Sequence, residues 1–321
     1  MQITMTKPDE LRIITRVARM YFEWDMRQSE IASQLGLSQA TVSRLLQRSK
    51  QEGIIRISVN IPSGVYTEIE EVLVKKYSLR DAMVVDSLED NEYMIQRDIG
   101  ASAAYFLESA IQANEVIGIS SWSATLLAMV NALNPLPRKP GIKVVQILGG
   151  VGNPGAEVHA AHLTSRLAVL VGGEPIFLPA PGVVGSEAAL QVLLEDEYIQ
   201  KTMSLFNDVT MALVGIGAVE PSALLQESGN IFSSLELEYL QKEGAVGDIL
   251  LHLFDDQGIP IDSRLNKRVI SMSLHQLRTV NQAIGLAGGK RKYRGILGAL
   301  RGGWINILIT DQFTAKRLSE E

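Results

Sequence analysis

The pattern of apolar and polar positions divides the chain into two parts. Over the first sixty residues, apolar side chains recur every three or four positions, which predicts amphipathic helices. From about residue 81 onward, short apolar runs alternate with longer amphipathic segments. That second pattern is typical of an α/β fold with a doubly wound, largely parallel sheet. The break "PSG" at 62–64 predicts a boundary, so we expect one domain at 1–61 and a second at 62–321.

Start and stop signals outline three helices in the first part. Pro8, followed by two acidic residues, predicts the start of the first helix. Asp25, with Gln28 three positions later, predicts a cap for the second helix, and Gly36 predicts its end. Ser38 then predicts the cap of the third helix. After this helix, "IIRISVNI" alternates strictly and predicts a strand, the wing of a small winged module.

The second and third helices have the spacing of a helix-turn-helix. Ala32 is small where the two helices cross, Gly36 lies in the turn, and apolar residues lock the helices together. The front of the third helix carries short polar side chains and arginines, which suit base edges and phosphates in a major groove: Gln39, Ala40, Thr41, Ser43, Arg44 and Arg48. We therefore predict that this face binds DNA. The alternative is an ordinary helical hairpin with a solvated polar face.

The charge distribution agrees with a DNA-binding first part. The chain has a formal net charge of −6, but residues 1–61 hold nine Lys/Arg and six Asp/Glu, or +3. Subtraction from the totals of 30 and 36 leaves 21 against 30, or −9, for the rest. A small basic module is thus joined to a large acidic one, and the local sign governs binding to a polyanion.

The second part contains eight apolar runs that predict strands. They lie at 81–86, 115–120, 143–150, 175–180, 209–217, 247–254, 282–289 and 305–311. Helix-length amphipathic segments lie between many of them, at 91–112, 122–133, 156–171 and 292–301.

Several of these strands end in loops rich in glycine and hydroxyl groups. The loops read "GISSWSAT" (118–125), "GGVGNPG" (149–155), "GIG" (215–217) and "AGGKRK" (287–292). Ligands of such sheets bind at the carboxyl ends of the strands, where helix N-termini attract anions. We predict a small-molecule anion site there, with a phosphate held by Ser120, Ser121, Ser123 and Thr125. No Walker lysine is present, which argues against ATP.

Four motifs together resemble the SorC family of sugar-responsive bacterial transcription regulators. They are "QSEIASQLGLSQATVSRLL", "ALVGIGAV", "GAVGDILLHLFDDQG" and "KYRGILGALRGGWINILITDQFTA", and the resemblance extends over about residues 10–318. It implies a C-terminal sensor domain akin to sugar-phosphate isomerases that binds a phosphorylated sugar or sugar-like effector. It also implies a homo-oligomer, usually a tetramer, on operator DNA.

The resemblance also implies roles for individual residues. The 118–125 loop corresponds to the phosphate-binding loop, although "SSWSA" replaces a common tryptophan-glycine step and favours binding by hydroxyls over backbone. Asp248 would accept sugar hydroxyls, and Lys292 would pair with the anion or a carbonyl. The pocket glycines would be Gly149, Gly150, Gly152, Gly215 and Gly217. The alternatives are that Asp248 only orients a loop and that Lys292 is only a solvated residue at a helix start.

Other polar and aromatic residues receive plainer interpretations. "EVHAAH" places Glu157, His159 and His162 near one another, but a further metal ligand is missing, so we expect no metal and no cofactor. Glu157 instead is a candidate for binding a ligand hydroxyl. We expect Asp311 to serve turn chemistry, and we expect Trp122 and Trp304 to lie in the core or an interface.

The remaining features set the cellular context and the competing functions. The chain has no cysteine, no signal peptide and no apolar run of about 20 residues, so we expect a cytoplasmic protein without a membrane partner. The leading hypothesis is a ligand-controlled DNA-binding regulator that is not an enzyme. The alternatives are an isomerase-like enzyme with an attached DNA-binding domain, for which no compelling acid–base pair is evident, and a nucleotide-sensing repressor.

Overall fold

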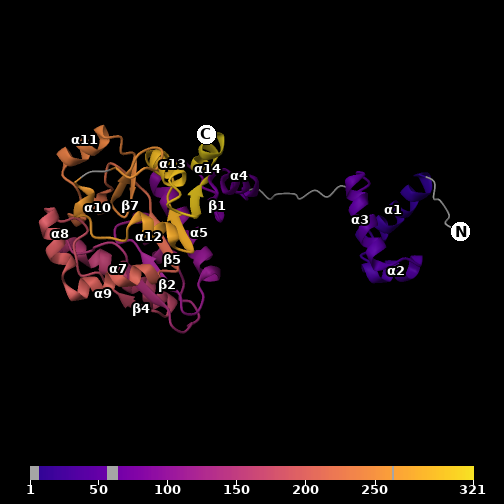
Figure 1. Ribbon diagram of the computed structural model, residues 1–321, viewed down its shortest axis with the longest axis horizontal. Helices are drawn as coiled ribbons and strands as arrows, with labels where there is room; N and C mark the ends of the chain where they lie inside the picture. Colours follow the sequence, from indigo (N-terminus) through magenta and orange to yellow (C-terminus); the bar gives the residue numbers. More distant parts are fainter. Residues whose placement is uncertain (1–6, 56–63, 262–263) are drawn as a thin grey trace. The chain divides into compact units, whose positions relative to one another are not determined.

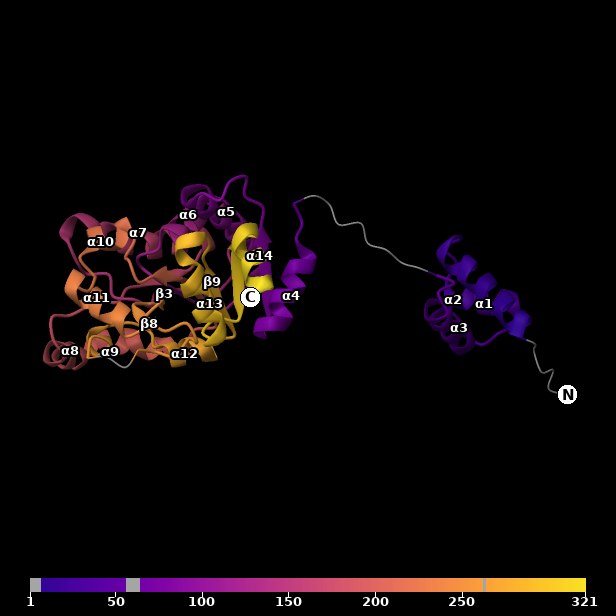
Figure 2. The ribbon, with the colours of Figure 1, turned by 90° about the horizontal axis from the view of Figure 1, so that it is seen from above.

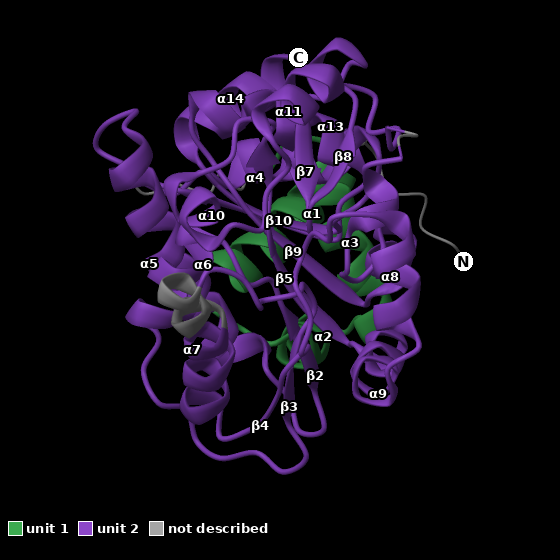
Figure 3. Ribbon diagram, turned by 90° about the vertical axis from the view of Figure 1, so that its left-hand side faces the viewer, with its two compact units in different colours: residues 1–61 green, residues 62–321 purple. Residues whose placement is uncertain are grey.

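The chain forms two compact units, residues 1–61 and 62–321, drawn in green and purple in Figure 3. The computed structural model describes residues 7–55, 64–261 and 264–321, and the side chains of all of these except residues 7–9 and 154–160. Most of the expected wing strand at 54–61 lies outside the described residues.

The described part of the first unit, residues 7–55, forms three helices, as predicted (Figure 1). Its helices are α1 (Lys7–Phe22), α2 (Gln28–Leu35) and α3 (Gln39–Gln51). Each helix contributes apolar side chains to one small core, which includes Val17 and Met20 of α1, Ile31 of α2, and Val42 and Leu46 of α3. These side chains repeat at helical spacing, so the core follows directly from the sequence pattern.

The turn between α2 and α3 has the predicted geometry. Gly36 has φ 65°, a left-handed conformation that glycine adopts without steric cost. Ser38 is the N-cap of α3, and its Oγ accepts a hydrogen bond of 3.1 Å from the amide of Thr41.

The predicted cap of α2 is wrong. Arg27, not Asp25, precedes the first helical residue, and Glu30 in the first turn accepts a 2.8 Å hydrogen bond from the Arg27 amide. Asp25 has φ 49°. It therefore turns the chain two residues before the cap position, and the acid inside the helix supplies the acceptor.

The second unit is built on a seven-stranded sheet in the order β1-β10-β9-β5-β2-β3-β4, and all neighbouring strands are parallel. The strands are β1 (Asp81–Val85), β2 (Val116–Ile119), β3 (Lys143–Gln146), β4 (Glu174–Ile176), β5 (Met211–Gly215), β9 (Gln282–Leu286) and β10 (Ile307–Asp311). The doubly wound α/β fold predicted from the alternating pattern is confirmed.

Helices cover both faces of this sheet and create two cores (Figures 2 and 3). The helices on one face are α5 (Glu92–Ala110), α6 (Ala124–Ala132) and α7 (Pro154–Val171). Those on the other are α4 (Thr67–Tyr77), α8 (Glu187–Leu194), α9 (Glu197–Ser204), α12 (Leu274–Thr279), α13 (Tyr293–Arg301) and α14 (Gln312–Glu320). Strand β5 serves both cores, because Met211 and Leu213 point to the first and Ala212 and Val214 to the second.

The prediction of a single strand at 247–254 is wrong. This segment is a hairpin of β7 (Gly247–Ile249) and β8 (His252–Phe254), which joins β6 (Gly217–Ala218) in a small antiparallel sheet. Leu250 and Leu251 form the turn with φ 54° and 65°. Two-residue hairpin turns with positive φ normally contain Asn or Gly, so the leucines gave no sequence signal for a turn.

The remaining elements are short. Helices α10 (Ala223–Ser228) and α11 (Ser234–Lys242) follow β6, and single 3-10 turns lie at Leu205–Asp208 (η1), Asn266–Arg268 (η2) and Lys290–Lys292 (η3). Among the helices of the described residues, none combines the length and apolar character needed to cross a bilayer.

Replacing Ser38 with alanine should destabilise α3 locally. The change removes an N-cap acceptor and should cost about 1 kcal/mol, which corresponds to roughly fivefold faster hydrogen exchange if α3 opens locally. Hydrogen–deuterium exchange of the α3 peptide measures this directly. Ser43→Ala, an exposed change in the middle of the same helix, is the matched control. Equal exchange in the two variants would contradict the capping role.

Candidate functional site

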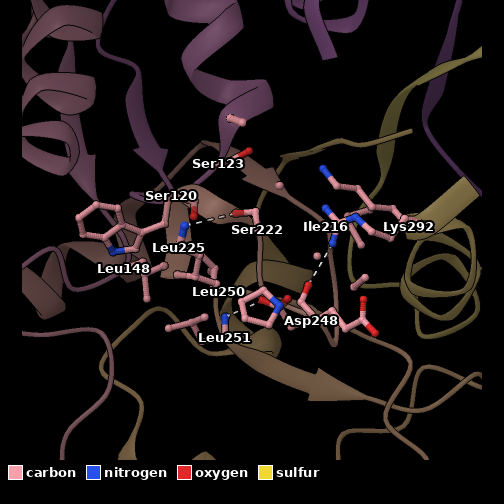
Figure 4. A pocket seen from close by; sticks show the side chains of 18 of the residues that line it. Ser120, Ser123, Leu148, Ile216, Ser222, Leu225, Asp248, Leu250, Leu251 and Lys292 are labelled. Atoms are coloured by element: carbon pink, nitrogen blue, oxygen red, sulfur yellow. Dashed lines mark hydrogen bonds between the residues drawn. The ribbon is translucent and has the colours of Figure 1, made fainter. Parts of the chain in front are cut away.

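A cavity of about 60 Å³ lies at the carboxyl ends of the central strands β2 and β5. Its walls come from the loops after these strands, the β7–β8 turn and the η3 turn after β9 (Figure 4). The polar residues that line it include Ser120, Ser123, Ser222, Asp248, Arg291 and Lys292. The position agrees with the rule that ligands of open parallel sheets bind beyond the carboxyl ends of the strands.

The loop after β2 supplies hydroxyls and a helix N-terminus. Ser120 is buried directly after the strand, and Ser123 caps α6 by accepting a 3.3 Å hydrogen bond from the Leu126 amide. Ala124, the first residue of α6, also lines the cavity. The first amides of a helix lack internal partners and attract negative charge. This wall therefore suits an anion.

Gly215 permits the close approach of the β5 loop to this wall. A Cβ atom at position 215 would lie 2.7 Å from Ser123 Oγ, and such a contact is too short. Only glycine therefore lets the backbone after β5 pass beside the Ser123 hydroxyl.

Lys292 brings a buried positive charge to the cavity. It precedes the first residue of α13 and is only 9% exposed. Burial lowers the pKa of its ammonium group, because the charged form is poorly solvated there. Within the described part of the chain, Lys292 has no hydrogen bond or ion pair through its side chain. The interpretation as a solvated helix-start lysine is wrong, and the ammonium is available to a ligand.

Asp248 lies on β7 and has two roles. Its Oδ2 accepts a 3.0 Å hydrogen bond from the amide of Leu251, so it orients the turn, and its side chain also lines the cavity. Desolvation raises the pKa of Asp248 to about 6, against the opposing effects of the Leu251 amide and the Lys292 charge. Gly217 lies opposite on β6, and a Cβ atom there would overlap Asp248 Oδ1.

Arg291 lines the cavity but was not singled out from the sequence. Its guanidinium donates hydrogen bonds of 2.7 and 3.2 Å to Glu92 and one of 3.0 Å to the Glu220 carbonyl. It thereby ties the η3 turn to the start of α5 and to the loop after β6. The run "KRK" at 290–292 was the available signal, since three basic residues open a loop–helix junction at the predicted ligand edge.

Two of the predicted phosphate ligands do not line the cavity. Ser121 Oγ donates a 2.6 Å hydrogen bond to the Leu148 carbonyl and accepts one of 3.1 Å from Gln146, so it joins the β2 and β3 loops. Thr125 is 1% exposed within the first turn of α6. Of the four hydroxyl residues, the structure therefore brings only Ser120 and Ser123 to the cavity.

The predicted pocket glycines also divide into residues that line the cavity and residues that do not. Gly215 and Gly217 line the cavity, whereas Gly149, Gly150 and Gly152 do not. A Cβ atom would strike the Pro181 carbonyl at position 149 and the Ser228 carbonyl at position 152. These two glycines allow neighbouring loops to pack.

The remaining candidate residues mostly pack in the core or cap a helix. Trp122 is buried and donates a 3.2 Å hydrogen bond to the Gly149 carbonyl, but it also lines the cavity, which was not expected. Trp304 is a core residue, bonded to the Gly258 carbonyl. Asp311 caps α14, as expected of turn chemistry.

The metal alternative involved Glu157, His159 and His162. His162 is exposed, and the side chains of Glu157 and His159 lie outside the described residues. Among the side chains that are described, no group of three His, Asp or Glu could hold a metal ion.

The predicted DNA-binding face of α3 is largely open. Gln39, Ala40, Ser43 and Arg44 are exposed, and Thr41 is half-buried beside the Ser38 cap. Arg48 is half-buried and forms ion pairs with Glu10 of α1 at 3.0 Å and with Glu52 at 2.5 Å.

These ion pairs distinguish the two arginines. Arg48 links α3 to α1, so a phosphate would have to compete with two carboxylates for its guanidinium. Arg44 forms no ion pair with any described residue and makes only a 3.4 Å contact to the Ala40 carbonyl.

Comparison with known proteins identifies the architecture. The Sugar-bind family model, which describes a sugar-binding domain, matches residues 64–319, and the model of a Crp-like helix-turn-helix domain matches residues 10–62. The chain belongs to the SorC family of sugar-responsive transcriptional regulators. The resemblance inferred from the four motifs is thus confirmed.

Relatives of the SorC family align over nearly the whole chain. The deoxyribonucleoside regulator of Bacillus subtilis is 32% identical over 310 residues, which cover 97% of this chain and 98% of that protein. The sorbitol operon regulator of Klebsiella pneumoniae is 29% identical over 320 residues, which cover 98% and 99%. The crystal structure of full-length SorC from Klebsiella pneumoniae matches with a TM-score of 0.73 at 28% identity and covers 97% of this chain and 99% of that one.

The raised pKa of Asp248 predicts an unusual dependence of stability on pH. An unfolded aspartate titrates near 3.9, so between about pH 4 and 6 the folded chain holds a proton that the unfolded chain has lost. This contribution to stability is fully present below pH 4 and is lost as the pH rises through about 6. Because the cavity admits some solvent, we expect the protonation of Asp248 to contribute roughly 1–3 kcal/mol to the free energy of unfolding.

Urea denaturation of the parent and of Asp248→Asn from pH 4 to 7 measures this contribution. Asparagine retains an acceptor for the Leu251 amide but cannot titrate, so the parent should lose stability relative to the variant as the pH rises. The exposed Asp256→Asn is the control and should follow the parent. Parallel profiles for the parent and Asp248→Asn would refute the assignment.

Proposed function

We propose that this SorC-family regulator binds operator DNA under the control of a phosphorylated sugar or sugar-like effector. The cavity at the carboxyl edge of the sheet is the proposed effector site. The observation that carries this proposal is the buried Lys292 ammonium, which faces the cavity without a protein partner among the described residues.

An anionic group on the effector best explains this arrangement. Leaving a buried charge unpaired is costly, and a bound anion would offset that cost. Ser120, Ser123 and the N-terminus of α6 line the same cavity and add hydrogen-bond donors. A phosphate monoester has the charge and the acceptor oxygens to use all of them.

The sugar part of the effector would lie against Asp248. A carboxylate accepts hydrogen bonds from hydroxyls, and Asp248 lines the cavity with one oxygen already oriented by the Leu251 amide. Glu157 stays a candidate for a further hydroxyl contact, and its side chain lies outside the described residues.

Residues 1–61 would carry the affinity for DNA, and residues 62–321 would bind the effector and hold the subunits together. One module of net charge +3 offers few phosphate contacts, so selective binding requires at least a dimer on paired half-sites. We further propose a homo-oligomer, a dimer or tetramer, that acts in the cytoplasm.

An enzymatic role is the second candidate. Asp248 and Lys292 have shifted pKa values in one cavity, and such pairs are also found in proton-transfer enzymes. The named relatives are regulators, which favours sensing over turnover. A turnover assay with the effector identified by a thermal-shift screen of sugar phosphates separates the two functions, since only an enzyme would consume the ligand.

Removing either charged group should weaken binding of the effector. A hydrogen bond to a charged partner contributes about 1.5–3 kcal/mol, so Lys292→Ala or Asp248→Ala should reduce effector affinity roughly tenfold to a hundredfold. Operator affinity without effector should stay near the parent value, because neither residue lies in the helix-turn-helix. Operator titration with and without effector measures both quantities.

Lys290→Ala is the matched control, since this lysine lies in the same turn and its side chain is 73% exposed. It should respond to the effector like the parent. If Lys292→Ala also responds like the parent, Lys292 is not part of the effector site.

Replacing Arg44 should relax operator recognition. If Arg44 contacts a base, Arg44→Ala should cost about 1–3 kcal/mol per half-site and reduce discrimination at one position. Affinities for the operator and for mutated operators at several salt concentrations measure this effect.

Lys50→Ala removes the same charge from an exposed position near the end of α3 and is the control. If Lys50→Ala lowers DNA affinity, it should lower the affinity for all DNA sequences equally. Unchanged discrimination in Arg44→Ala would mean that another part of the surface reads the operator. Arg48→Ala is less diagnostic, because it also breaks the link to Glu10.

A further inference from the structure

A second, smaller cavity adjoins the effector cavity. It measures about 20 Å³ and shares part of its wall with the first, namely Ala218, Pro221, Leu225, Asp248 and Leu251. Lys292, Ser120 and Ser123 line only the first cavity. A ligand anchored at those three residues would therefore have its anionic end in the first cavity and the shared wall at its other end.

The walls of the second cavity are almost entirely apolar. Val219, Ile231, Phe232, Leu237 and Leu253 complete its lining, and the carboxylate at the shared wall is the only ionisable group among the described residues that line it. A space of this size holds about one small group. Water in it would find few hydrogen-bond partners, so an apolar carbon is the better occupant.

The leucine turn brings this apolar wall to the ligand. Leu250 and Leu251 are buried although both have positive φ, a backbone conformation that leucine rarely adopts. The Asp248 carboxylate bonds the Leu251 amide, and Ser271 Oγ donates a 3.0 Å hydrogen bond to the Leu250 carbonyl. These bonds hold Leu251 at the boundary of the two cavities, where it lines both.

We propose that this site selects effectors whose end remote from the phosphate carries a deoxy or methyl carbon, which enters the apolar cavity formed with Leu237 and Leu251. This proposal rests on the proposed function and specifies the class of effector. The residues that line this cavity beyond the shared wall are all apolar among those described. A hydroxyl carried past the Asp248 carboxylate would therefore gain no partner there, which an apolar pocket disfavours by a factor of roughly 10 to 100.

Calorimetric titration with matched sugar phosphates tests the selection. The probes are 2-deoxyribose 5-phosphate against ribose 5-phosphate, and 2-deoxyglucose 6-phosphate against glucose 6-phosphate. Each pair differs by one hydroxyl near the end remote from the phosphate. We expect the deoxy member of at least one pair to bind roughly 10- to 100-fold more tightly. Equal or weaker binding of both deoxy sugars would overturn the proposal.

Two variants of α11 locate the effect. Leu237 is half-buried and lines the second cavity, whereas Leu235 on the same helix is 78% exposed and lines neither cavity. Leu237→Asn supplies a partner for a hydroxyl and should abolish or reverse the preference for the deoxy sugar. Leu235→Asn should retain it. Retention of the preference in Leu237→Asn would also overturn the proposal.

A third comparison separates this proposal from the one on which it rests. Unphosphorylated 2-deoxyribose should bind far more weakly than its 5-phosphate. If both bind equally and still better than ribose, the phosphorylated-effector proposal fails while the apolar selection stands. If the phosphate is required but the deoxy preference is absent, the apolar selection fails while the phosphorylated-effector proposal stands.

Discussion

The proposed effector site is organised around two charged groups that the fold removes from water. Lys292 and Asp248 line one cavity, and desolvation disfavours the charged form of each. Within the described residues no direct ion pair joins them. Their attraction across the cavity only partly offsets the cost of burial, so the protein alone does not fully compensate either charge. A ligand that carries both an anion and hydroxyls would satisfy both groups at once.

The parallel sheet makes this arrangement available to residues far apart in the sequence. In a parallel sheet every strand ends at the same edge, so loops after β2, β5 and β9 meet although they are separated by up to about 170 positions. Glycines at 215 and 217 then let the β5 loop pass close to Ser123 and Asp248. The side chains supply the charges and hydroxyls. The parallel sheet and the absence of a Cβ atom at Gly215 and Gly217 determine how closely the loops that carry them approach one another.

The sequence predicted the fold better than the site. Apolar runs of six to nine residues identified the strands of the main sheet, because its central strands are buried on both faces and read as continuous hydrophobicity. The same rule failed at 247–254, since a turn made of two leucines is also a continuous apolar run. Asp25 failed as a cap because its acceptor role is taken by Glu30, which lies inside α2.

For the proposed site, sequence spacing identified the loops but not the side chains that line the cavity. Ser120 and Ser121 are neighbours, yet one lines the cavity and the other bonds Leu148, a difference that depends on local backbone direction. Gly149 and Gly215 look alike in the sequence, but one packs against a carbonyl and the other borders the cavity. The family resemblance was a better guide, since Asp248 and Lys292 both line the cavity, and a buried lysine requires compensation of its charge. That requirement also connects the proposed site to regulation. An effector shifts operator affinity only through a conformation that it prefers, and in our proposal the two buried charges would favour a conformation that encloses an anionic effector.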